Sequence, residues 1–302
     1  MYQGGLYKHE QIVELVEDLG GYIIQKNNLQ TDMVILMLVP EEDMPIVEAK
    51  AKELLGKLTK SPLAGSEVAV VTPTLAYQHL PHLACDVAEY LRRNGAKTNM
   101  IGLARGVGKR VAQLKASEID LINEHDIAVF LFGNFEECIK QKSKLFVDID
   151  VPVVVAGGPQ MDSNAVPNCS SYIGGLGRLM HRLKRKEEME TMDRLVNVLG
   201  DLLDERRRDL DKDPLSISPQ RIMNEIDKQL PDIHDSLAPA PITLNLNGAR
   251  IKLPYTEYAD DIRNLKLEEG ICLKEVADVK SSKMRDYILI RIKPKSETGF
   301  VI

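Results

Sequence analysis

Between residues 66 and 181, five short apolar segments alternate with stretches of helical periodicity. These segments are EVAVVTP (67–73), KTNMIGLA (97–104), DIAVFLF (126–132), VPVVVAG (151–157) and SYIGG (171–175). Continuous apolar runs of this length are typical of strands buried on both faces, which requires a parallel sheet with helices on each side. The sequence therefore predicts an α/β protein with a central, doubly wound, mostly parallel sheet of the Rossmann or flavodoxin-like kind.

The remainder of the 302-residue chain differs in pattern on either side of this segment. The first part reads as helix, two strands and helix, which fits a plait-like unit. The last part is strand-rich and contains Asn247-Gly248, a strong hairpin signal. We expect a small plait-like α/β unit (1–64), the doubly wound domain for cofactor or partner binding (65–181), a helical segment with a linker (182–238) and a small β-rich C-terminal domain (239–302).

A long amphipathic helix is predicted after the last strand of the central domain, in LKRKEEMETMDRLVNVLGDLLDERRRDLDK. Its apolar residues recur at steps of three and four and form one stripe, which consists of Met192, Leu195, Val196, Leu199, Leu202 and Leu203. Such a stripe is usually buried against its own domain. The length of the helix leaves the docking of a partner as the alternative.

Composition excludes several classes of protein. The net charge of −6, the 5% aromatic content and the absence of tryptophan argue against nucleic-acid binding. No apolar run approaches the ~20 residues of a transmembrane helix, and the first residues lack the pattern of a signal peptide, so we expect a cytoplasmic protein without membrane contact. The four cysteines are far apart and form no CxxC pair, which argues against a disulfide framework and an autonomous zinc site.

A candidate metal-binding segment is QHLPHLACDVAEYLRR (78–93). Pro81 suits a first helical turn, so His79 falls in the preceding loop while His82 and Cys85 lie three residues apart on one helix face. Cys85 falls about 100° from the apolar stripe, and the helix N-terminus favours its thiolate, the form that binds metals. The alternative is a half-buried cysteine beside histidines that bond to loop carbonyls.

The other cysteines receive different interpretations. Cys169, in VPNCSSY, is the second candidate metal ligand because we expect this loop close to the ligand-binding edge of the sheet. Cys138 shares an apolar face with Phe135 and Ile139, which favours a core position. Cys272 stands between apolar residues in a strand-like run, which also favours packing.

Glycine-rich segments follow the predicted strands, at the edge where open α/β sheets bind ligands. GLARGVGKR and GGLGRLMHR resemble nucleotide motifs but lack the required residues at Leu103, Arg110 and Met180. What they retain is a combination of accessible backbone amides and nearby cations, which suits an anion or a cofactor. The candidate cofactor-binding residues are Arg105, Gly106, Gly157, Gly158, Gly175, Gly177, Arg178 and His181. The alternative is two solvated basic faces.

No Ser/His/Asp or Cys/His/Asn arrangement can be assembled from spacing alone, so no catalytic residue is assigned. His125, which precedes an apolar strand, is interpreted as a structural cap.

Long phrases distributed from about residue 5 to 262 resemble one family of methanogenic archaea, the methanogenesis marker protein 7 family. They are LYKHEQIVELVEDLGGYIIQKN, HLPHLACDVAEYLRRNGAKTNMIGLARGVGKR, INEHDIAVFLFGN, VVVAGGP, GGLGR and LPYTEYADDI. The resemblance implies a non-catalytic subunit of the ATP-dependent complex that reduces the nickel centre of methyl-coenzyme M reductase to Ni(I). The implied partners are the reductase and its operon-encoded accessory protein, other methanogenesis marker proteins, and the ATP-binding activation component that hydrolyses ATP.

The resemblance also implies an iron–sulfur cluster, of the complex nitrogenase-cofactor type, held at a subunit interface for low-potential electron transfer. Cys85 would then be a thiolate ligand, with His79 or His82 as a nitrogen ligand or as a donor that tunes the cluster. Arg105, Arg178 and His181 would offset its negative charge. Two alternatives stay open, which are a corrinoid or nickel tetrapyrrole bound directly in a flavodoxin-like cleft, and a purely structural adaptor.

Overall fold

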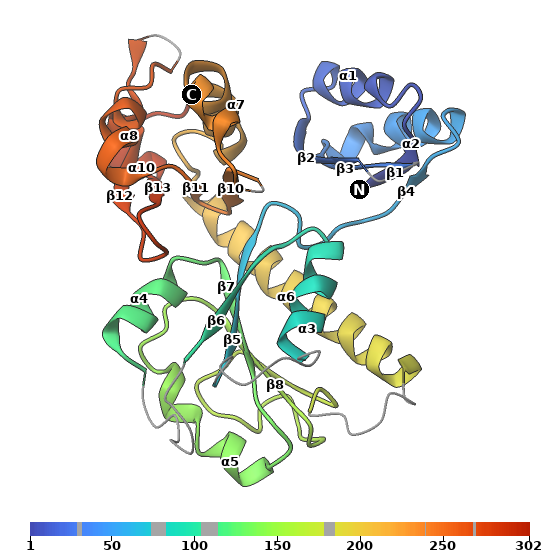
Figure 1. The fold of residues 1–302 in the computed structure, drawn as a ribbon, viewed down its shortest axis with the longest axis vertical. Helices are drawn as coiled ribbons and strands as arrows, with labels where there is room; N and C mark the ends of the chain where they lie inside the picture. The colour runs from blue at the N-terminus through green and yellow to red at the C-terminus, as the bar shows by residue number, and fades with distance from the viewer. Residues whose placement is uncertain (29–31, 74–82, 104–113, 178–184, 239, 268–269) are drawn as a thin grey trace.

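The computed structural model describes the chain except for residues 29–31, 74–82, 104–113, 178–184, 239 and 268–269. Three sheets and one long helix, α6 (Arg185–Lys212), organise the fold. In Figure 1 the N-terminal and C-terminal units lie on one side of α6 and the central parallel sheet lies on the other. None of the helices in the described ranges is both long and apolar enough to span a membrane.

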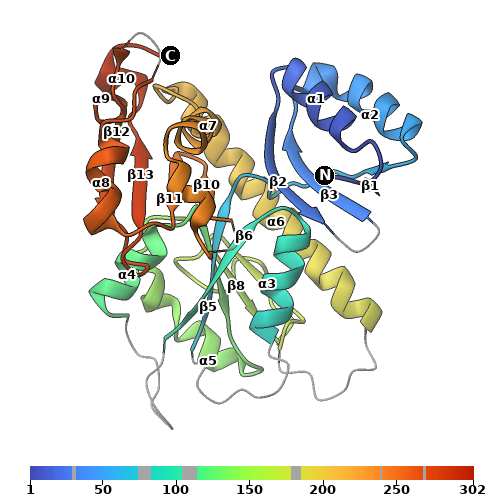
Figure 2. The same cartoon turned by 45° about the horizontal axis from the view of Figure 1, so that its top comes forward.

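The N-terminal unit is a four-stranded antiparallel sheet of order β2-β3-β1-β4 with two helices on one face (Figure 2). Its element order, β-α-β-β-α-β, is that of a split βαβ plait. The sequence indicated the helix, two strands and helix of this unit but not its outer strands β1 and β4. The core between helices and sheet includes Tyr2, Ile12, Ile35 and Val47. The elements are β1 (Tyr2–Gly5), α1 (Glu10–Asp18), β2 (Tyr22–Asn28), β3 (Asp32–Leu38), η1 (Glu41–Asp43), α2 (Met44–Glu53) and β4 (Lys57–Leu58).

The central sheet contains five strands in the order β6-β5-β7-β8-β9, and every neighbouring pair is parallel. All five strands lie in the segments that the sequence predicted. They are β5 (Glu67–Thr72), β6 (Lys97–Gly102), β7 (Ile127–Leu131), β8 (Val153–Gly157) and β9 (Ser171–Gly174).

Both faces of this sheet are covered by helices. Val68 and Val70 point into a core shared with α3 (Leu83–Arg93) and α6, whereas Ala69 and Val71 point into a core on the opposite face. This alternation is the period-two pattern of a strand whose two faces are both buried. The second face carries α4 (Ala116–Asn123), α5 (Glu136–Lys140) and η2 (Ser143–Phe146).

The apolar stripe of α6 is buried against the central domain. Leu195, Leu199 and Leu203 are fully buried in the same core as α3, and Leu202 is half-buried at its margin. This confirms that the stripe packs on its own chain.

The C-terminal unit is an antiparallel sheet of order β10-β11-β13-β12 with several helices, so it is mixed α/β where the sequence indicated mainly strands. Its first helix begins at a cap, because Ser218 Oγ accepts a hydrogen bond from Arg221 N at 3.2 Å. The elements are α7 (Pro219–Gln229), η3 (Pro231–Asp235), β10 (Ile242–Asn245), β11 (Gly248–Ile251), α8 (Tyr255–Arg263), α9 (Leu273–Val276), β12 (Ala277–Ser281), β13 (Ile288–Ile292) and α10 (Lys295–Thr298).

The predicted hairpin at Asn247-Gly248 is present, with Asn245 paired to Gly248 across a two-residue turn. Gly248 already belongs to β11, where a Cβ would lie 2.9 Å from the carbonyl carbon of Ile290. The glycine is therefore required by the close approach of β13.

Candidate functional site

The glycines that follow β8 and β9 meet at the carboxyl edge of the parallel sheet, as predicted. Gly158 N donates to Gly133 O at 3.0 Å, and Leu176 N donates to Gly157 O at 2.8 Å. A Cβ on Gly158 or on Gly177 would collide with the Asn134 side chain, which follows β7. The glycines therefore let Asn134 contact the neighbouring backbone.

Two of the glycine amides are already used inside the protein. Gly158 N bonds to Gly133 O, and Gly175 N donates to Gly158 O at 3.3 Å. Gly175 also has a φ of +93°, a left-handed conformation that favours glycine. A backbone anion site at this edge would therefore need other donors than these two amides, and cofactor binding by Gly157, Gly158, Gly175 and Gly177 stays a prediction.

Several predicted site residues lie outside the described residues, so their roles also stay predictions. These residues are the histidines His79, His82 and His181, the arginines Arg105 and Arg178, and Gly106.

Cys85 lies in the first turn of α3, which follows β5, and its side chain is exposed. The buried residues of α3 are Ala84, Val87, Ala88 and Leu91. The thiol is thus off the packing stripe, as the periodicity indicated, and is accessible to a partner. Within the described ranges, no group of three or more His, Cys, Asp or Glu side chains is arranged to hold a metal ion.

Cys169 lies at the edge of the sheet opposite to the one expected. It comes directly before β9, and the neighbouring Ser170 N donates to Val153 O at the start of β8. The Cys169 Sγ donates to Val166 O at 3.1 Å, and burial raises the pKa of its thiol to about 11. The structure does not bring Cys169 to Cys85, and these surroundings favour the protonated thiol over a metal-binding thiolate.

The core position predicted for Cys138 is wrong, because this side chain is exposed. The helix α5 is short, and Ile139 is its buried residue, while the preceding Phe135 is 78% exposed. Cys272 is half-buried before α9.

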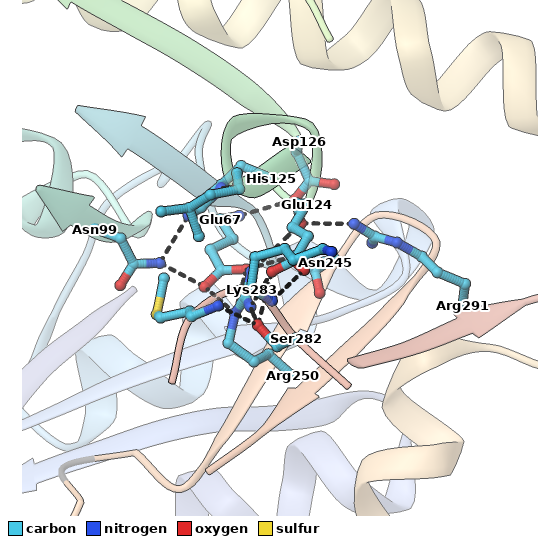
Figure 3. A network of polar contacts seen from close by, with 12 residues as sticks. Glu67, Asn99, Glu124, His125, Asp126, Asn245, Arg250, Ser282, Lys283 and Arg291 are labelled. Carbon is cyan, nitrogen blue, oxygen red and sulfur yellow. Dashed lines mark hydrogen bonds and ion pairs between the residues drawn. The ribbon is translucent and has the colours of Figure 1, made fainter. Parts of the chain in front are cut away.

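A buried ionic cluster at the amino edge of the parallel sheet was not anticipated from the sequence (Figure 3). At its centre is Arg250 of β11, which is completely buried. Its Nε and Nη2 donate to the Glu67 carboxylate at 2.9 and 3.0 Å, and its Nη1 donates to Glu124 Oε2 at 2.8 Å. Because Glu67 begins β5 and Glu124 follows α4, one arginine joins the C-terminal sheet to the central domain. Arg250 also donates to the Ser282 hydroxyl and, at 3.5 Å, to the carbonyl oxygen of Glu124.

Further polar groups surround these charges. Asn245 Nδ2 donates to Glu67 Oε2 at 2.8 Å, and Arg291 Nη2 donates to Glu124 O at 2.6 Å. His125 Nδ1 lies 2.9 Å from Leu121 O at the end of α4. This contact supports the interpretation of His125 as a structural cap.

The environment shifts the pKa values of the Glu67 and Asp126 carboxylates in opposite directions. Burial raises the pKa of Glu67, but the charges of His125 and Arg250 and the hydrogen bonds of the cluster outweigh burial, so its pKa lies below the ordinary value. Burial raises the pKa of Asp126 to about 6, although its carboxylate accepts backbone N–H bonds from Glu67 and Leu246. Arg250, Glu67 and Glu124 are therefore occupied by one another, and they join the C-terminal unit to the central domain. The one signal for this cluster in the sequence was that an acidic residue, Glu67 or Asp126, stands at the start of each of two otherwise apolar strands.

Comparison with known proteins adds a relationship to these observations. The sequence model of the family described as methyl-coenzyme M reductase operon protein C matches residues 1–265. An uncharacterized protein of Methanocaldococcus jannaschii is 48% identical over 299 residues, which cover 99% of this chain and 94% of that protein.

Proposed function

Because this chain belongs to the methyl-coenzyme M reductase operon protein C family, we propose that it is a subunit of the complex that reductively activates methyl-coenzyme M reductase. The family match over residues 1–265 is the observation that supports a role linked to the reductase. The finer parts of the proposal are the marker protein 7 identity and the reduction of the nickel centre to Ni(I), and they rest on the sequence resemblance. The proposed partners are the reductase, its operon-encoded accessory protein, other marker proteins and an ATP-binding component.

We further propose that Cys85 contributes one thiolate to an iron–sulfur cluster shared with a partner. Its thiol is exposed in the first turn of α3, where a second protein can approach it. One cysteine is only part of a ligand set, so the remaining ligands would come from His79 or His82 or from the partner. When bound, the cluster would supply low-potential electrons, while Cys85 holds and orients it.

A second candidate function is the direct binding of a corrinoid or nickel tetrapyrrole. The strand order β6-β5-β7-β8-β9 favours this alternative, because it is the flavodoxin-like order, with a ligand crevice between the first and third strands along the chain. In this protein the crevice would lie between β5 and β7. The cysteine would then play no part in cofactor retention.

The experiment is an anaerobic purification of the tagged protein with its native partners. Iron and sulfide are quantified, and EPR and visible spectra are recorded, for the wild type, Cys85→Ala and Cys138→Ala. Cys138 is a matched control because its thiol is also exposed but lies on a different helix. We expect co-purification of the reductase, and loss of iron and of the EPR signal in Cys85→Ala alone.

Three other outcomes would change the proposal. Sharp visible bands that survive Cys85→Ala would favour the tetrapyrrole. Equal iron content in both cysteine variants would refute the ligand role of Cys85. A wild type that neither co-purifies with the reductase nor affects its activation would refute the proposed function itself.

A further inference from the structure

A cleft of about 1060 Å³ separates the N-terminal unit from the C-terminal half of α6 and the start of the C-terminal unit. Figures 1 and 2 show how the two outer units stand apart above α6. Many of the lining residues are apolar and come from all three parts of the fold, among them Met37, Leu38, Leu58, Leu210, Leu215 and Ile217. The cleft is separate from the glycine-rich edge, and it shares only Asn245 with the residues of the ionic cluster described above.

Two buried polar atoms among the residues that line this cleft have no hydrogen-bond partner. Asn245 is 1% exposed, and its Nδ2 donates to the Glu67 carboxylate, which can only accept. The assignment of the amide is therefore fixed, and its Oδ1 is an acceptor without a donor. Ser61 Oγ, a hydroxyl that can donate or accept, also has no partner. A buried polar atom without a partner costs ~1–3 kcal/mol, so a polar group that bonded to either atom would be stabilising.

The rim of the cleft is acidic on opposite walls. Glu41 and Glu48 are exposed on the N-terminal unit, and Asp211 is exposed on α6. Within the described part of the chain, the structure records no ion pair for these three carboxylates. The cation Arg207 is already paired with Asp204 at 2.6 Å. The remaining cations among the described lining residues are Lys60 and the N-terminal ammonium of Met1, which donates to Thr59 O.

We propose that this cleft is the docking site for a basic amphipathic segment of a partner protein. Apolar side chains of such a segment would cover the floor, and its lysines or arginines would meet Glu48 on one wall and Asp211 on the other. The inference rests on the proposed function, because the partner would be another subunit of the same complex.

Charge and size support this occupant over others. The chain carries a net charge of −6, so a second copy would be repelled by the acidic rim. The volume of about 1060 Å³ slightly exceeds the ~300–1,000 Å³ of small-molecule pockets, and the acidic groups lie on separate structural units. A segment that bridges both walls satisfies more of these groups than a small cation does.

The first test uses two labelled synthetic helical peptides, one of leucine and lysine and one of leucine and glutamate, in fluorescence anisotropy titrations. The variant Glu48→Lys with Asp211→Lys is compared with a control that reverses two exposed carboxylates outside the cleft, Glu17→Lys with Asp235→Lys. We expect the lysine peptide to bind the wild type and the control alike, and the cleft variant about tenfold more weakly or worse. Equal binding to both variants, or equal binding of the glutamate peptide, would overturn the proposal.

The second test uses the native complex. A photo-crosslinker attached at Gln220→Cys, in the cleft, is expected to capture a partner segment rich in lysine or arginine and apolar residues. If the wild type and the cleft variant co-purify equally with the reductase, the docking site is wrong and the proposed function stands. If no reductase subunit co-purifies with the wild type, the proposed function itself is refuted, whatever the result for the cleft variant.

Discussion

Replacement of Arg250 by methionine tests whether the buried cluster holds the C-terminal unit to the central domain. The guanidinium bonds to Glu67 and to Glu124 and is completely buried. Methionine fills much of the same volume but leaves both carboxylates without their cation. Removing one partner of a buried ion pair costs about 3–5 kcal/mol. We expect a loss of this size in the free energy of unfolding at pH 7.

The pH dependence of this loss follows from the carboxylates. In the wild type the pKa of Glu67 lies below its ordinary value, so its stabilising contribution is present above the unfolded pKa and disappears as the pH falls through the folded pKa. Without Arg250, burial would raise the pKa of Glu67, and protonation would relieve the cost at lower pH. The difference in the free energy of unfolding between the wild type and Arg250→Met should therefore become smaller as the pH falls from 7 to 5.

The assay is urea unfolding followed by circular dichroism, with amide hydrogen exchange in β10 and β11 as a local probe. Arg93→Met is the matched control, because Arg93 forms an exposed pair with Glu89 at 3.1 Å, and loss of such a pair costs about 1 kcal/mol or less. A loss below about 1 kcal/mol for Arg250→Met, or one of equal size at pH 5 and pH 7, would refute the reasoning.

Three further predictions concern single side chains. Because burial raises the pKa of Asp126 to about 6 from 3.8, its folded state favours the proton. The free energy of unfolding of the wild type should therefore fall by about 2 kcal/mol relative to that of Asp126→Asn as the pH rises from 4 to 7 in urea titrations. Gly177→Ala should lower stability by about 1–3 kcal/mol in urea unfolding, because the new Cβ collides with Asn134 and lies 2.6 Å from the Gly158 Cα. Leu199→Ala, in the buried stripe of α6, should cost about 2–5 kcal/mol in the same assay.

Matched controls isolate each of these effects. Gly133→Ala adds a Cβ that meets nothing within 4 Å, and Met189→Ala changes a 43% exposed residue of α6. Both should change stability by about 0.5 kcal/mol or less. Equal losses for Gly177→Ala and Gly133→Ala, or for Leu199→Ala and Met189→Ala, would contradict the packing described above. An unfolding difference between wild type and Asp126→Asn that is independent of pH would contradict the shifted titration.

Local patterns in the sequence predicted helices and strands well where an element is buried along its whole length, on one face or on both. The segment 151–157 predicted β8 (Val153–Gly157), and the stripe through Leu195 and Leu199 predicted the buried face of α6. Periodicity succeeds here because a strand covered on both faces, or a helix buried on one, needs apolar residues at fixed intervals. The position of Cys169 was also contained in the chain order, since a residue before a parallel strand lies at the amino edge. Its assignment to the ligand edge was an error of topology.

Cys138 shows the limit of the same reasoning. Cys138 and Ile139 are adjacent in the short helix α5 (Glu136–Lys140) and point in different directions, so Ile139 is buried in the core whereas Cys138 is exposed. A helix this short is placed by its connections more than by its periodicity. The length of the helix was not readable from the pattern.

The sequence by itself determined the parallel sheet, the long helix and the hairpin, and it indicated a link to methyl-coenzyme M reductase. Only the tertiary structure decided that Arg250 meets Glu67 across 183 positions of the chain, and that three units enclose one acidic cleft. Strands and helices follow from steric preferences and hydrophobic periodicity, which depend on residues that are close together in the sequence. Contacts between distant charges depend on how whole units pack, and no local pattern encodes that packing.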